Sequence, residues 1–139
     1  MLQFSPNLVA GADINPFRIC KVFSSSTVSF AGAPATAVTD YVCGVTDGST
    51  RRFDSTAHAL AATSTTVADT ISLQPSNCVQ IEAGAAITNA GTGLMPTTGG
   101  KAITAATTGT IPMFVSLEPA AADGVIFWAY RLPATRGIA

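Results

Sequence analysis

Few residues in this sequence have the chemistry that catalysis requires, and they are widely separated along the chain. His58 is the only histidine and lies in an Ala- and Thr-rich segment. A nucleophilic triad needs such a histidine beside a Ser or Cys and a carboxylate, but Ser and Thr are so common here that one near His58 carries no information. Acid–base catalysis needs paired carboxylates, and seven of the eight acidic residues stand alone in sequence: Asp40, Asp47, Asp54, Asp69, Glu82, Glu118 and Asp123. We therefore expect no enzyme.

Metal and phosphate sites are not indicated either. Cys20, Cys43 and Cys78 are evenly spread and form no CxxC pair, so we predict that they are small buried side chains of strands in a reducing compartment. The glycine-rich segments 91–93 and 99–101 lack the Walker spacing and a following helix, which predicts turns. We expect no metal and no cofactor.

Two other groups of side chains could bind a partner. Trp128 and Tyr130 alternate with Ile126 on one strand face, which favours a core or interface position but is also compatible with a stacking platform for a sugar. Arg51 and Arg52 form a modest basic pair, which is either simply solvated or pairs with acidic groups on a partner.

The composition narrows the class of protein. The 139 residues suit one domain, the formal net charge is −1, and only 11% of residues are charged while 47% are hydrophobic. So few charges favour a protein packed against other subunits, the alternative being a monomer with a Thr- and Ser-rich surface. A basic footprint for nucleic acid is missing. The longest apolar stretch, residues 27–44, is broken by Asp40 and Pro34, so we expect no membrane contact, and we expect no signal peptide.

Turn residues divide the chain into short β-like segments. Segments rich in β-branched and aromatic residues predict about nine strands, at residues 19–23, 27–30, 39–46, 69–73, three within 78–105, 111–118 and 125–132. Gly32 and Pro34 are interpreted as a break, and residues 55–68 as a loop with at most one or two helical turns. The fold class that follows is all-β, a small β-barrel or sandwich.

The two ends of the chain have distinct patterns. Residues 1–17 carry apolar side chains between Pro6, Gly11 and Pro16, which predicts an extended N-terminal arm before a single β domain of residues 18–139. The arm needs a partner surface on its own domain or on a neighbour, and Phe4 and Leu8 are the expected anchors. The strand at 125–132 is apolar on both faces, which predicts that it is central or covered by another subunit.

From Val79 onward the sequence resembles the small capsid decoration (cement) proteins of tailed bacteriophages. Those proteins have an alternating apolar strand that ends in Ala-Gly, then glycine corners, a Gly-Lys-Ala turn and a final Gly-x-x-Val strand. The matching residues here are Val79, Ile81, Ala83, Gly84, Ile87, Gly91, Leu94, Gly100, Lys101, Ala102, Val115, Leu117, Glu118, Asp123, Gly124, Val125 and Phe127. The likeness covers about residues 69–132. Trp128 and Tyr130 make the last strand more aromatic than the family pattern.

The resemblance implies a function without catalysis. It implies a homotrimer on the outer surface of the virion capsid that bridges neighbouring copies of the major capsid protein and stabilises them against internal pressure. In this hypothesis Phe4, Leu8, Arg51 and Arg52 contact the partner. The alternative is a glycan- or other ligand-binding β module of a head fibre or tail, with Trp128 and Tyr130 in the site.

Overall fold

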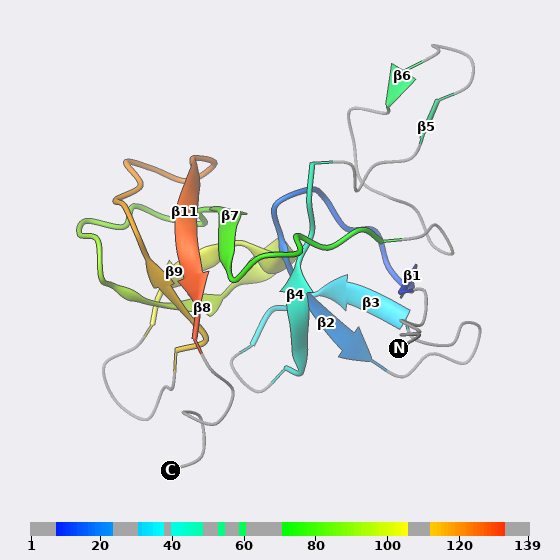
Figure 1. The fold of residues 1–139 in the computed structure, drawn as a ribbon, viewed down its shortest axis with the longest axis horizontal. Helices are drawn as coiled ribbons and strands as arrows, with labels where there is room; N and C mark the ends of the chain where they lie inside the picture. Colours follow the sequence, from blue (N-terminus) through cyan, green and yellow to red (C-terminus); the bar gives the residue numbers. More distant parts are fainter. Residues whose placement is uncertain are drawn as a thin grey trace, which may run out of the picture.

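The protein is all-β, as the sequence predicts (Figure 1). The structure is a computed structural model that describes residues 8–23, 31–37, 40–48, 53–54, 59–60, 71–105 and 112–132. These residues form eleven strands and one short 3-10 turn, and none of them is in an α-helix.

Four strands near the N-terminus form the first sheet. They are β1 (Val9–Ala10), β2 (Ile19–Phe23), β3 (Ala31–Pro34) and β4 (Val42–Val45), in the order β1-β3-β2-β4. β1 runs parallel to β3, and the other neighbours are antiparallel. Two further strands, β5 (Phe53–Asp54) and β6 (Ala59–Leu60), pair only with each other among the described strands.

The second sheet is built from the C-terminal half and curls into a small barrel. It contains β7 (Cys78–Glu82), β8 (Gly93–Pro96), β9 (Ala102–Thr104), β10 (Phe114–Ser116) and β11 (Ile126–Arg131), in the antiparallel order β7-β11-β10-β8-β9. Just past β7, Ala83 forms a parallel bridge with Ala102 of β9. Gly84 N donates a hydrogen bond to the Ala102 carbonyl at 2.8 Å. The two edge strands are thus joined, and closure of this kind protects sheet edges.

Both sheets contribute to one main core. Period-2 alternation turns Val79 and Ile81 of β7 inward, where they lie opposite Ala129 and Phe127 of β11. Side chains of the first sheet join them, so the two sheets share one buried cluster. The buried cluster comprises Ile19, Ala35, Val45, Val79, Ile81, Ala83, Ile87, Leu94, Ala102, Phe114, Ala120, Phe127 and Ala129.

A second, smaller cluster fixes the chain before β2. It contains Ala10, Ile14, Cys20 and Ile71, with Leu8, Cys43 and Leu73 packed against it. The Leu8 carbonyl accepts a hydrogen bond from Ile71 N at 2.8 Å. Residues 8–17 of the expected arm therefore lie on their own domain, one of the two surfaces that the sequence left open, whereas residues 1–7 lie outside the described part of the chain.

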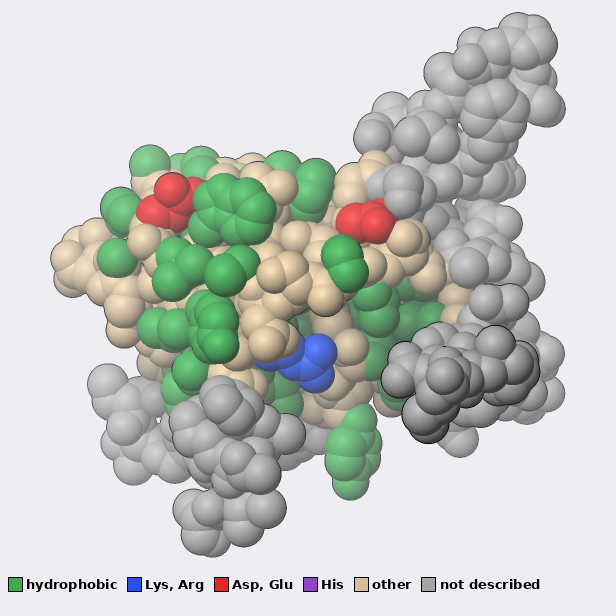
Figure 2. Space-filling model, in the orientation of Figure 1, with side chains coloured by type: hydrophobic (Ala, Val, Ile, Leu, Met, Phe, Trp, Pro, Cys, Tyr) green, Lys and Arg blue, Asp and Glu red, His purple; other side chains and the backbone are tan. Residues whose placement is uncertain are grey.

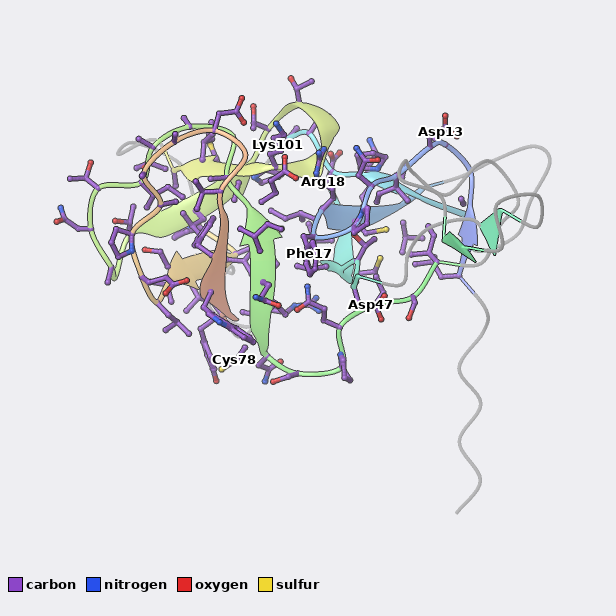
Figure 3. All side chains as sticks on the ribbon, turned by 90° about the horizontal axis from the view of Figure 1, so that it is seen from above. Asp13, Phe17, Arg18, Asp47, Cys78 and Lys101 are labelled. Atoms are coloured by element: carbon purple, nitrogen blue, oxygen red, sulfur yellow. The ribbon has the colours of Figure 1, made fainter. Side chains whose placement is uncertain are left out.

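An ion-pair network joins the barrel to the first sheet. The Arg18 guanidinium contacts Glu82 Oε2 at 3.1 Å and donates to the Gly99 carbonyl at 2.9 Å. Lys101 Nζ lies 3.2 Å from the same Glu82 oxygen and 2.8 Å from Asp123 Oδ1. Figure 3 shows Arg18 and Lys101 close together where the two sheets meet. The network holds η1 (Thr98–Gly100) against β2.

Three of the predicted elements are wrong. The segment 55–68, interpreted as a loop, contains strand β6, which pairs with β5. The segment interpreted as a break is strand β3: Gly32 packs close to the cluster, where an added Cβ would lie 2.7 Å from Ile71 Cδ1, and Pro34 ends the strand. The strand predicted at 69–73 is reduced, in its described residues, to one bridge between Leu73 and Thr46. The strand predicted at 27–30 lies outside the described residues.

Candidate functional site

The expected partner contacts are only partly covered by the structure. Phe4, Arg51, Arg52 and His58 lie outside the described residues. Leu8 is half-buried against the second cluster of its own chain, which leaves little of its side chain for a partner.

Neither a metal-ion site nor a membrane-spanning helix is found among the described residues. They contain no group of three or more His, Cys, Asp or Glu residues that could hold a metal ion. No helix of this described part is long and apolar enough to cross a membrane.

The most distinctive surface feature is the outward side of β11. Ile126, Trp128 and Tyr130 are 41%, 43% and 38% exposed, while Phe127 and Ala129 between them are buried. β11 lies between β7 and β10, so its outward side chains occupy the interior of the sheet surface rather than its margin. In Figure 2 apolar side chains gather over the position of β11 on this side of the molecule.

The neighbouring strand β10 extends this apolar surface. Val115 lies opposite Tyr130, and Leu117 N donates to the Trp128 carbonyl at 2.9 Å. Leu117 is 49% exposed, which places another large apolar side chain beside Trp128. We call the five side chains Val115, Leu117, Ile126, Trp128 and Tyr130 the β11 face. Contiguous exposed apolar surface of this kind marks binding sites in soluble proteins.

Polar side chains of β7 border the β11 face on its other side. Cys78 lies opposite Tyr130, Gln80 opposite Trp128, and Glu82 opposite Ile126. Gln80 is held in place through its backbone, since its N donates to Gln74 Oε1 at 2.8 Å and its carbonyl accepts from Gln74 Nε2 at 2.7 Å. An apolar centre with a polar rim is the usual anatomy of a protein interface.

The charged groups around the β11 face are engaged within the chain. The Arg131 guanidinium donates to the carbonyls of Val42 and Cys43, each at 3.2 Å. Glu118 Oε1 accepts a hydrogen bond from Trp128 N at 3.0 Å. Glu82 is paired with Arg18 and Lys101. Among the described residues, the β11 face therefore presents apolar surface bordered by charges that are already paired.

The Gly99–Lys101 turn has a structural role. Lys101 Nζ is held by Asp123 and Glu82, and these hydrogen bonds, with Asp123 the stronger influence, raise the pKa of the Lys101 ammonium. The same contact lowers the pKa of the Asp123 carboxyl. With its charge neutralised inside the chain, Lys101 serves the junction between the sheets rather than a phosphate.

The three cysteines do not share one environment. Cys20 is buried as predicted, Cys43 is half-buried, and Cys78 is exposed. The prediction of a buried side chain is wrong for Cys78, because it starts β7 on the outward side, opposite exposed Tyr130. The sequence placed Ile126, Trp128 and Tyr130 on one face of a strand but did not show that this face points outward.

The comparisons concern the fold. No protein-family model and no curated protein matches the sequence. Among solved structures, the chain is similar to the N base of head fiber gp8.5 in bacteriophage phi29, with a TM-score of 0.62, 15% sequence identity, and coverage of 91% of each chain. At this identity the likeness establishes a common fold over nearly the full length of both chains.

Proposed function

We propose that the protein is a structural component of a bacteriophage head that binds the outer surface of the capsid as a decoration protein. The fold that it has in common with a phage head-fibre base supports a role at the head. The residue pattern from Val79 to Phe127 supports decoration, since it resembles that of capsid cement proteins. In this role the protein performs no reaction and uses no cofactor.

The β11 face is the observation that carries this proposal. It presents Trp128, Tyr130, Ile126 and Leu117 on a preformed sheet that the core behind it keeps in place. Each square ångström of apolar surface that it buries against the major capsid protein contributes about 25 cal/mol, less the cost of association. Each protomer that bridges neighbouring capsid subunits adds this interface between them. The added interface raises the barrier to their separation.

Further contacts complete the proposed assembly. The protein acts as a homotrimer, so that three β11 faces engage the shell together. Once one face has bound, the other two are held near their sites at a high effective concentration, and the trimer binds more tightly than a single face. Phe4, Arg51 and Arg52 remain the proposed reaching contacts, and Leu8 positions the start of the arm from the second cluster. The location is the virion, after assembly in the host cytoplasm.

Co-sedimentation with purified phage heads lacking the protein tests this proposal. Trp128→Ser removes the largest side chain of the β11 face and lowers apparent affinity by about 10-fold or more, as for an interface anchor. The matched control is Tyr41→Ser, because Tyr41 is an aromatic residue 84% exposed in the segment before β4. Equal binding by the wild-type and Trp128→Ser proteins, or equal loss in both variants, contradicts a specific role for the β11 face.

A second function is favoured by the exposure of Trp128 and Tyr130 on one side of the same strand. Two adjacent exposed rings could stack on the apolar face of a sugar, as in a glycan-binding module of a head fibre or tail. Trp128 is the only tryptophan of the chain, so its fluorescence reports on this position alone. Saturable quenching by a glycan supports the second function, and no response over a glycan panel, together with head binding, supports decoration.

A further inference from the structure

Two thiols of the first sheet lie together although they come from different strands. Cys43 Sγ of β4 donates to the Cys20 carbonyl of β2 at 3.3 Å, and the Cys43 side chain packs against the cluster that contains Cys20. In the ladder, Cys20 lies opposite Gly44 and Lys21 opposite Val42, so Cys43 is the additional residue of a bulge. Bulges redirect a side chain, and here both thiols belong to the second hydrophobic cluster.

The two thiols differ in access and in acidity. Cys20 is fully buried, whereas Cys43 is half-buried and can meet a small reagent. The hydrogen bond from the Cys20 thiol lowers the pKa of Cys43; burial opposes this, and the positive Arg131 guanidinium nearby acts with it. The hydrogen bond with Cys43, followed by burial, raises the pKa of the Cys20 thiol. Cys43 is therefore the nucleophile of the pair.

We propose that Cys43 and Cys20 form a reversible disulfide site that reacts with a small disulfide oxidant such as glutathione disulfide. The Cys43 thiolate attacks one sulfur of the oxidant, which forms a mixed disulfide and releases one glutathione thiolate. Cys20 then loses its proton to solvent and attacks Cys43 Sγ, and the second glutathione leaves as a thiolate. The two protein thiols are oxidised to one disulfide and the oxidant is reduced to two glutathione molecules.

The second step is helped by the first. Both the hydrogen bond and the negative charge of Cys43 hold the proton on Cys20, and both are lost once Cys43 is in a mixed disulfide. Burial of Cys20 excludes glutathione but not the adjacent Cys43 sulfur. The product joins β2 to β4, and such a bond persists where the surroundings are oxidising. The inference does not depend on the proposed function.

The third cysteine, Cys78, is replaced before the test. It lies on β7 in the other sheet and is exposed, so its own reaction with the oxidant would be added to that of the pair; Cys78→Ser removes it. The folded Cys78→Ser protein is treated with glutathione disulfide, digested with trypsin and analysed by mass spectrometry. Cleavage after Arg18 and Lys21 places Cys20 and Cys43 on separate peptides. The expected product is one cross-linked pair of these peptides that has lost two hydrogens and carries no glutathione.

Two further variants separate the steps. With Cys20→Ser added, glutathione remains on Cys43 because no thiol resolves it; with Cys43→Ser added, Cys20 stays unmodified in the folded protein. Oxidation of the Cys78→Ser protein raises its melting temperature by roughly 5 °C, and dithiothreitol reverses the rise. The proposal is overturned if the folded Cys78→Ser protein keeps both thiols free, or keeps a stable glutathione adduct on Cys43, under conditions in which the urea-unfolded protein reacts.

Discussion

Gly91 and Gly100 have the same backbone conformation in different surroundings. Both have φ of about +81°, where only glycine is unstrained. A Cβ at Gly100 would lie 2.7 Å from the Ile19 carbonyl oxygen and 3.0 Å from the Arg18 Cβ, whereas one at Gly91 would meet nothing within 4 Å. Gly100 is therefore required twice, for its conformation and for the close approach of η1 to β2.

The two glycines allow the two requirements to be separated by experiment. Gly91→Ala lowers the free energy of unfolding by about 1–2 kcal/mol, the cost of a left-handed alanine. Gly100→Ala has the same conformational cost and in addition forces η1 away from β2, which adds about 1–3 kcal/mol. Urea denaturation measures both values. Equal losses would show that the contact between Gly100 and Ile19 does not constrain the fold.

Individual residues also show how far the sequence could predict the site. The glycine corners at Gly91, Gly99 and Gly100 are confirmed, because positive φ is a local property of the chain. Leu8 was expected to anchor the arm on its own domain or on a neighbour, and the structure packs it against a cluster of its own chain that includes the distant Ile71. Contacts of that kind have no local signal.

Strand β11 illustrates what periodicity can and cannot decide. The segment was predicted as a strand apolar on both faces and central or covered, and it is central in its sheet. Alternation alone could not determine that Phe127 faces the core and Trp128 faces outward, because both faces are apolar. That choice depends on the register with β7, which pairs buried Ile81 with Phe127.

The connection between β3 and β4 is stabilised by a carboxylate. Asp40 Oδ2 accepts hydrogen bonds from the backbone N of Thr36 at 2.9 Å and of Ala37 at 3.1 Å, and Lys21 Nζ lies 3.6 Å away. Burial alone would raise the pKa of the Asp40 carboxyl, but these N–H groups and Lys21 outweigh it and lower the pKa. The contacts therefore favour the ionised form.

This lowered pKa predicts an acid-dependent loss of stability. The stabilisation from Asp40 is fully present above the unfolded-state pKa of about 3.9 and is lost as the pH falls through the lower folded-state pKa. Asp40→Asn removes that contribution, so its melting temperature lies below that of the wild type near neutral pH and the difference narrows in acid. Thermal melts across about pH 2–7 measure it. A difference that does not change with pH would show that the charge of Asp40 is not responsible.

The whole molecule combines a continuous core with a low charge. Side chains of both sheets share one cluster, and Arg18, Glu82 and Lys101 fasten the sheets at their junction. In the part of the chain that the structure describes, the ion pairs lie within the chain and the β11 face is an exposed apolar surface. The all-β class could be predicted from composition and turn spacing. Which side of β11 points outward could be determined only from the pairing of β11 with β7 in the folded structure.

Hydroxyl-radical footprinting of the free and head-bound protein tests the central claim most directly. The radical oxidises exposed aromatic side chains, and peptide mass spectrometry assigns the modification to each residue of this chain. We expect Trp128 and Tyr130, at 43% and 38% exposure, to be oxidised several-fold less on heads than in solution, while the 84% exposed Tyr41 provides the internal comparison. Equal oxidation of Trp128 and Tyr130 in the two states would contradict the claim that the β11 face is the capsid-binding surface.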